Sequence, residues 1–170
     1  RNAPLPEVQK ALSDVFLPTD KLPIPFTTLV VNTGSKLIAL DTGTGGQLAS
    51  MAPQSGTFST NLAAAGIDPK SVDTIVISHF HPDHINGIKT KDNEIVFSNA
   101  EIKVPAKEWA FWMDNANARE AETKLVSSYM LNARRIFADI RSRVTPFADT
   151  QEVAPGIVPV DAPGHTPGHT

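Results

Sequence analysis

The spacing of apolar residues along the chain predicts a series of short β-strands. Positions 26–31 and 36–40 are mostly apolar or β-branched and lie on either side of a turn-forming sequence at 32–35, which predicts a β-hairpin. The run 72–78 is rich in β-branched residues and predicts a buried strand that leads directly into His79. Further short strands are expected at 95–97, 101–104, 152–154 and 157–160.

Helical spacing predicts the remaining elements. A helix is expected from about Thr57 to Ala65, ended by Gly66. A longer helical region is expected from 106 to 143, broken near 115–117, with an apolar face made by Leu125, Tyr129, Ala133, Ile136 and Ile140. Five prolines in residues 1–25 indicate an irregular segment with one or two helical turns.

Strands, helices and strands again indicate one layered α/β domain over residues 1–170. We expect the strands at 26–31, 36–40 and 74–78 to share a sheet, with the helix at 118–142 packed outside it. A chain of 170 residues is long enough to bury a substantial core.

Composition narrows the function. The net charge of -3 disfavours nucleic-acid and membrane-surface partners, and with them a nuclease, because such partners require a positive surface. No apolar run reaches the ~18 residues of a membrane span. The chain has no cysteine, so a bound metal must be held by nitrogen and oxygen. Absence of cysteine also fits an oxidising compartment, so we expect a periplasmic or secreted protein in preference to a cytoplasmic one.

All five histidines fall in two short motifs, which predicts a metal site. His79-Phe80-His81-Pro82-Asp83-His84 holds three of them with a carboxylate, and the segment 165–169 holds the other two. Residues two apart on an extended segment point the same way, so His79 and His81 can bind one cation together. Asp83 and His84 project to a neighbouring point where a second cation could lie, and His169 is the candidate third ligand of the first.

Two simpler interpretations stay open. The histidines could be surface residues on polar loops, and His165 taken alone fits that description well. The second interpretation is a site for a single zinc ion, held by His79, His81 and His169.

The motif H-x-H-x-D-H after a strand, followed by G-H-T-P-G-H, resembles the metallo-β-lactamase superfamily. Leu40-Asp41-Thr42-Gly43 is similar to that superfamily's first motif. The segments VNTGSKLIALDTG, ISHFHPDHINGI, AEIKVPAKEWAFWMD and APGHTPGHT resemble its methyl parathion hydrolase and organophosphate hydrolase branch. The resemblance implies an αββα sandwich, of which this chain would supply mainly the N-terminal half.

The resemblance also implies roles for single residues. His79, His81 and His169 would hold one of two divalent metal ions, expected to be zinc, and Asp83 and His84 would help to hold the other; His165 matches a position that is not usually a ligand. Asp41 would orient a ligand histidine, although an Asp before Gly43 also suits a simple turn.

In the superfamily a bridging Asp and a last His follow the second motif, and residues 1–170 contain no match to them. We therefore expect the domain to be incomplete, with an apolar sheet face that bears Val30, Ile38 and Ile75 left bare. Such a face would be covered in a homodimer or by a chain that carries the C-terminal half.

The expected function is hydrolysis of an ester-type bond, such as a phosphotriester, in a small molecule by a metal-bound hydroxide. Asp83 would orient that hydroxide or carry a proton, and Trp112, which matches an aromatic residue of the phosphotriesterase branch, would line the substrate pocket. The alternatives are a lactonase or thioester hydrolase on the same scaffold, a mononuclear iron oxygenase, and a metal-binding fragment without turnover.

Overall fold

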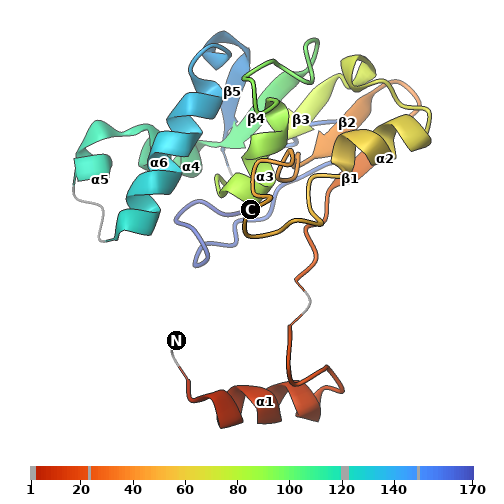
Figure 1. Ribbon diagram of the computed structural model, residues 1–170. Coiled ribbons are helices and arrows are strands. Elements are labelled where there is room, and N and C mark those ends of the chain that lie inside the picture. The colour runs from red at the N-terminus through yellow and green to blue at the C-terminus, as the bar shows by residue number, and fades with distance from the viewer. Residues whose placement is uncertain (1–2, 23, 120–122, 149) are drawn as a thin grey trace.

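The centre of the protein is a five-stranded sheet with the strand order β1-β2-β3-β4-β5 (Figure 1). The computed structural model describes residues 3–22, 24–119, 123–148 and 150–170. The strands are Leu29–Asn32, Leu37–Leu40, Thr74–Val76, Glu101–Pro105 and Val144–Phe147. β1 and β2 form an antiparallel hairpin, and each later strand is parallel to its neighbour. The hairpin and the strands predicted near 72–78 and 101–104 are confirmed, although β1 begins at Leu29.

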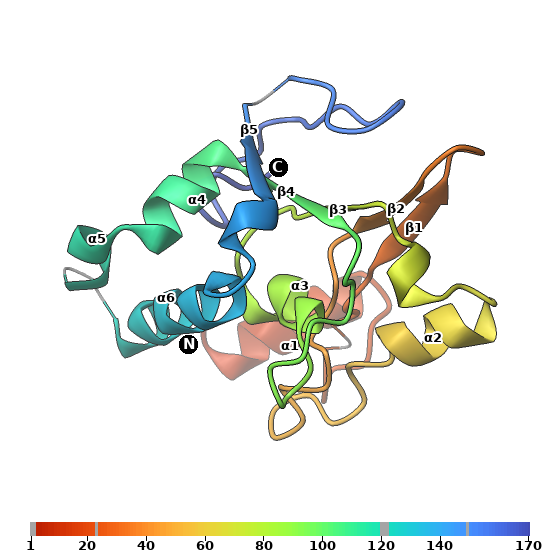
Figure 2. The ribbon, with the colours of Figure 1, turned by 90° about the horizontal axis from the view of Figure 1, so that it is seen from above.

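Helices cover one face of this sheet (Figure 2). They are α2 Phe58–Ala64, α3 Pro82–Ile85, α4 Ala106–Met113, α5 Asn115–Arg119 and α6 Lys124–Phe137, with 3-10 turns at Pro69–Ser71, Asn86–Ile88 and Arg141–Arg143. The expected break in the long helical region lies at Asp114, and positions 120–122 of that prediction lie outside the described residues. Among the described residues, no helix has the length and apolar character needed to cross a bilayer.

α1 (Leu5–Asp14) stands away from this body (Figure 1). It spans 10 residues, more than the one or two turns predicted, and none of them is buried. Prolines at positions 4 and 6 fit its start, because the first backbone N–H groups of a helix have no partner within the helix.

The helix-covered face carries the main core. Ile75, Ile102 and Val104 lie there in one buried cluster with residues of α6. Ile136 and Ile140 are fully buried as predicted, but Leu125 is 58% exposed, so its placement on the buried face is wrong. Four-residue steps advance about 400° around a helix, so Leu125 lies about 80° from Ala133. Met130 and Phe137 take the buried face instead.

The opposite face is covered in part by the chain that follows β5. Ile38, Val76 and Phe147 pack there with Val153 and Ala154. Ile38 is 0% exposed, as is Ile75 on the helix side, so the expectation that these side chains share one bare face is wrong. Ile75 pairs in register with Ala39, and the neighbouring Ile38 therefore points to the other face.

Three of the predicted strands do not form, because contacts with distant parts of the chain determine the backbone conformation there. The expected strand at 95–97 contributes only an isolated bridge between Lys89 and Ile95, and those at 152–154 and 157–160 only a bridge between Ala154 and Ile157. The edge strand β5 was not predicted. It contains Pro146, which removes one donor and is tolerated at an edge.

Candidate metal centre

Neighbouring parallel strands end at one edge of the sheet and place the first histidine motif there. β2 is followed by Asp41, whose backbone N–H donates to Val76 O of β3 at 2.9 Å. Ile77 and Ser78 separate the end of β3 from His79. Thr42 holds the C-terminal end of the motif, because its N–H and its hydroxyl both donate to His84 O, at 2.8 and 2.7 Å. The motif is therefore fixed at both ends to the segment after β2.

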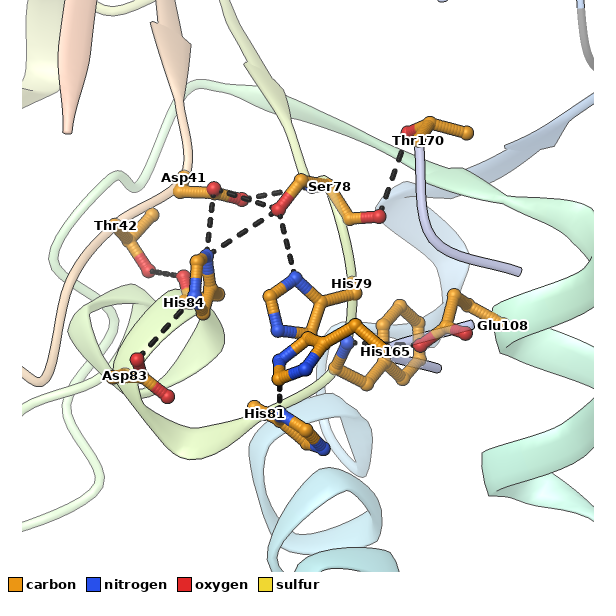
Figure 3. Close-up of polar contacts among 11 residues, drawn as sticks. Asp41, Thr42, Ser78, His79, His81, Asp83, His84, Glu108, His165 and Thr170 are labelled. Atoms are coloured by element: carbon orange, nitrogen blue, oxygen red, sulfur yellow. Dashed lines mark hydrogen bonds and ion pairs between the residues drawn. The ribbon is translucent and has the colours of Figure 1, made fainter. Parts of the chain in front are cut away.

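Asp41 forms the centre of a small hydrogen-bond network (Figure 3). Its carboxylate accepts from the Ser78 N–H and hydroxyl, both at 2.8 Å, and lies 2.8 Å from His84 Nδ1. Its φ of 58° is uncommon for a residue other than glycine. An Asp that served only a turn would bond within its own segment, whereas these partners are 37 and 43 positions away. That Asp41 orients His84 toward a metal stays a prediction.

His79 lies in the middle of the imidazole cluster. Its ring centroid is 3.9 Å from that of His84 and between 4.7 and 4.8 Å from those of His81, His165 and His169. The side chain is 2% exposed, and its Nε2 is buried without a hydrogen-bond partner. Ser78 Oγ, 3.0 Å from Nδ1, holds the other ring nitrogen. An unpartnered buried nitrogen is unfavourable in itself and fits a metal ligand.

Structure and sequence differ most over which histidine joins His79 and His81 as a third metal ligand. The ligand atoms of His79, His81 and His165 lie within 4.8 Å of one another, and His81 Nδ1 is 3.0 Å from His165 Nε2. His169 faces His79 but has its Nδ1 3.2 Å from Ala162 O. Three nitrogens that held one zinc ion at about 2.1 Å would lie about 3.4 Å apart, so these histidines would hold an ion only with their nitrogens closer together. The structure thus adds His165 as a candidate ligand, and the assignment of His169 stays a prediction.

Burial and hydrogen bonding shift the pKa values of three histidines in the cluster. It lowers the pKa of His79 to about 2 and, with the neighbouring His165, that of His81 to about 4. Burial would also lower the pKa of His84, but hydrogen bonds to Asp41 and Asp83 outweigh it and raise that pKa to about 9. His79 and His81 are therefore neutral near pH 7, the form in which imidazole binds metals.

Asp83 lies in the first turn of α3, beside His84. Its Oδ2 is 3.3 Å from His84 Nε2. Burial opposes ionisation of Asp83, yet the hydrogen bond from His84 lowers the pKa of its carboxyl below the ordinary value. Asp83 is therefore ionised at neutral pH and is available as a metal ligand or proton acceptor.

Trp112 lies behind His81 and not on an open surface. It is 2% exposed, its ring centroid is 5.7 Å from that of His81, and its Nε1 donates to Glu108 Oε2 at 2.6 Å. In this structure it supports the His81 loop, and its role in a substrate pocket stays a prediction.

An open cavity of about 590 Å³ is lined by Pro82, which follows His81, and by residues of α6. Its walls include Met51, Leu125 and Tyr129, and the Tyr129 ring is 5.1 Å from the His81 ring. Met51 and Leu125 are 72% and 58% exposed. The cavity thus has apolar residues on part of its wall, and polar residues such as Gln47, Asn132 and Arg135 on the rest.

Sequence reasoning missed two polar residues of this site, Ser78 and Glu108. Ser78 directly precedes the histidine motif, which was the available signal. Glu108 gave none, because a Glu in the first turn of a helix is ordinary and its partners lie 28 and 60 positions away.

Comparisons with known proteins match most of the chain to one family. A family model described as the metallo-beta-lactamase superfamily matches residues 23–170. A 42-residue stretch is 43% identical to a linear primary-alkylsulfatase from a Pseudomonas species, over 25% of this chain and 8% of that protein.

Two solved structures cover nearly the whole chain. The hydrolase AbOPH of the beta lactamase superfamily is 28% identical with a TM-score of 0.86, over 99% of this chain and 58% of that one. AidC, a dizinc quorum-quenching lactonase, is 29% identical with a TM-score of 0.82, over 98% of this chain and 58% of that one. The chain therefore spans a little over half the length of these structural relatives.

Proposed function

The chain belongs to the metallo-β-lactamase superfamily, and from this membership we propose that it supplies metal ligands to a hydrolase that cleaves an ester-type bond in a small molecule. One observation carries the proposal. His79 has a buried Nε2 without a hydrogen-bond partner, in the middle of four other imidazole rings. The neutral imidazoles of His79 and His81 beside the ionised carboxylate of Asp83 suit a borderline cation such as zinc.

The residues divide into two groups around this point. His79, His81 and one histidine of the 165–169 segment would hold the first ion, and Asp83 and His84 the second. Two divalent cations bound there, which we propose are zinc, would supply a water of lowered pKa and polarise the bond under attack. The Asp83 carboxylate, ionised at neutral pH, would orient that water and accept its proton. Asp41 would keep the His84 ring in one orientation.

Two substrate classes follow from the relatives and the cavity. The resemblance of the sequence motifs to the organophosphate hydrolase branch favours a phosphotriester, and the likeness to the lactonase AidC favours a lactone. The apolar residues Leu48, Met51 and Leu125 in the wall of the cavity next to Pro82 suit an apolar or aromatic leaving group in the first case and an acyl chain in the second. We place the phosphotriester first, because the resemblance in sequence motifs is to that branch.

The test uses the purified protein with its metal content measured per chain. Turnover of a nitrophenyl phosphotriester and of an N-acyl homoserine lactone is followed before chelation, after chelation and after zinc is restored. We expect loss on chelation and recovery with zinc. Turnover that survives complete metal removal would refute the mechanism, and turnover of the lactone alone would exchange the order of the two substrates.

A pair of carboxylate variants locates the chemistry. Asp83→Asn should reduce kcat at least about 100-fold, because it removes a proton acceptor and a ligand charge. Asp92→Asn removes an exposed carboxylate outside the histidine cluster and should leave kcat unchanged. Equal activity of the two variants would contradict the role of Asp83. A protein that binds metal but turns over neither substrate would favour the non-catalytic alternative.

A further inference from the structure

We infer that Glu108 is a positioning residue that clamps the two histidine motifs to each other. The inference rests on the proposed function in that the clamp would shape its metal site. Glu108 is 0% exposed and lies in the first turn of α4, behind the cluster. A side chain that is fully buried is not accessible to a substrate from solvent, so its effect must pass through the segments that it holds.

The carboxylate of Glu108 joins three separate places in the chain. Oε2 accepts from the Phe80 backbone N–H at 3.0 Å and from Trp112 Nε1 at 2.6 Å. Oε1 accepts from the Gly168 backbone N–H at 2.7 Å. Phe80 lies between His79 and His81, and Gly168 directly precedes His169. One side chain therefore fixes the backbone next to three of the five histidines.

Close packing at Gly168 supports the same inference independently. A Cβ on Gly168 would lie 2.5 Å from Glu108 N and 2.6 Å from Lys107 Cβ. The first of these is a backbone atom, so it cannot be relieved by a side-chain rotation. Only a glycine lets the 165–169 segment approach the start of α4 closely enough for its N–H to reach the carboxylate.

The chemistry of Glu108 argues against a role in packing alone. A buried carboxylate is unfavourable unless donors satisfy it, and an apolar side chain of the same volume would fill the space at lower cost. The three donors here are neutral N–H groups, two of them from the backbone of the metal-binding segments. Such bonds hold backbone position, which side-chain packing controls less well.

The experiment compares Glu108→Gln with the wild-type protein and with Leu62→Ala. Gln keeps the size of Glu108 but replaces one acceptor oxygen by an NH₂ group that faces an N–H donor. Leu62 is a buried residue of α2 with no place in the site, so Leu62→Ala controls for general destabilisation. Amide hydrogen exchange at Phe80 and Gly168 is measured by NMR in the metal-free protein, and zinc affinity by competition with a chromophoric chelator.

For Glu108→Gln we expect amide exchange about 10–100-fold faster at Phe80, Gly168 or both, since hydrogen bonds to a charged group are lost. Zinc affinity should fall about 10–100-fold. Where turnover is measurable, kcat should fall with KM little changed. Leu62→Ala should change none of these at the site. Exchange and zinc affinity equal to wild type in a folded Glu108→Gln protein would overturn the inference.

Gly168→Ala keeps the inference testable if Glu108→Gln does not fold. It leaves the carboxylate in place and displaces only the second motif. Exchange of the amide at position 168, corrected for the intrinsic difference between Gly and Ala, should then become faster while Phe80 stays protected, and unchanged exchange at position 168 would overturn the clamp. The metal-free exchange also separates the two proposals. A protein that shows the clamp but hydrolyses nothing keeps the inference and loses the proposed function.

Discussion

Gly87→Ala tests whether the segment after β2 and the turn after α3 must touch for the site to form. Gly87 follows α3 in the 3-10 turn Asn86–Ile88, and its N–H donates to Gly43 O at 3.0 Å. A Cβ at this position would lie 1.9 Å from Thr42 O and 2.8 Å from Thr42 C. Both are backbone atoms of the segment that also carries Asp41, so one of the two segments must move.

The cost can be estimated from what that movement breaks. A contact of 1.9 Å is about 1 Å closer than real Cβ contacts come, and overpacking of this kind costs about 1–3 kcal/mol. Moving Thr42 away also weakens its two hydrogen bonds to His84 O, each worth about 1 kcal/mol. We therefore expect Gly87→Ala to lower the free energy of unfolding by about 3–4 kcal/mol, a large part of the 5–15 kcal/mol typical of a domain.

The assay is equilibrium unfolding in urea, together with zinc content after dialysis. Gly66→Ala is the matched control, because Gly66 has a φ of +72° but nothing within 4 Å of its Cβ position. That control should lose only the roughly 1 kcal/mol that left-handed backbone costs an alanine, and should keep its zinc. A Gly87→Ala protein that unfolds at the same urea concentration as Gly66→Ala, or holds as much zinc, would refute the argument.

Three further outcomes follow from the structure. The pKa of His79 is near 2 and that of His81 near 4 in the folded protein, below the 6.5 of the unfolded chain, so these two residues make the folded state less stable as the pH falls below about 6.5. The pKa of His84 is raised to about 9, so this residue makes the folded state more stable at low pH and offsets part of the loss. The metal-free protein should lose about 3 kcal/mol of stability from pH 7 to pH 5 in urea titrations, and greater stability at pH 5 would contradict this. Ile136→Ala should cost about 2–5 kcal/mol in the same assay, because the side chain is fully buried. Thr123→Ala removes the side chain that accepts from Val126 N at the start of α6 and should cost about 1 kcal/mol, and a neutral result would exclude that cap.

The sequence alone located the candidate metal centre and most of the elements around it. The β1–β2 hairpin follows from local chemistry, because Asn32 Oδ1 accepts from the Gly34 N–H within the turn. The first histidine motif was recognisable because its ligands lie within six residues of one another, directly after a strand whose apolar run is plain. Interactions within a few residues leave a pattern that a single sequence can show.

Only the tertiary structure decided which distant residues meet. The sequence motif does not show whether His165 or His169 lies nearer to His81. The path of the chain after β5 decides this, and it places the His165 ring beside the His81 ring. The role of Glu108 could not be predicted for the same reason, because its backbone partners Phe80 and Gly168 are remote from it in the sequence. Apolar character likewise does not tell which side of a strand a residue occupies, and strand register put Ile38 and Ile75 on opposite faces. Register and loop path depend on the energy of the whole packed chain, which the local pattern does not contain.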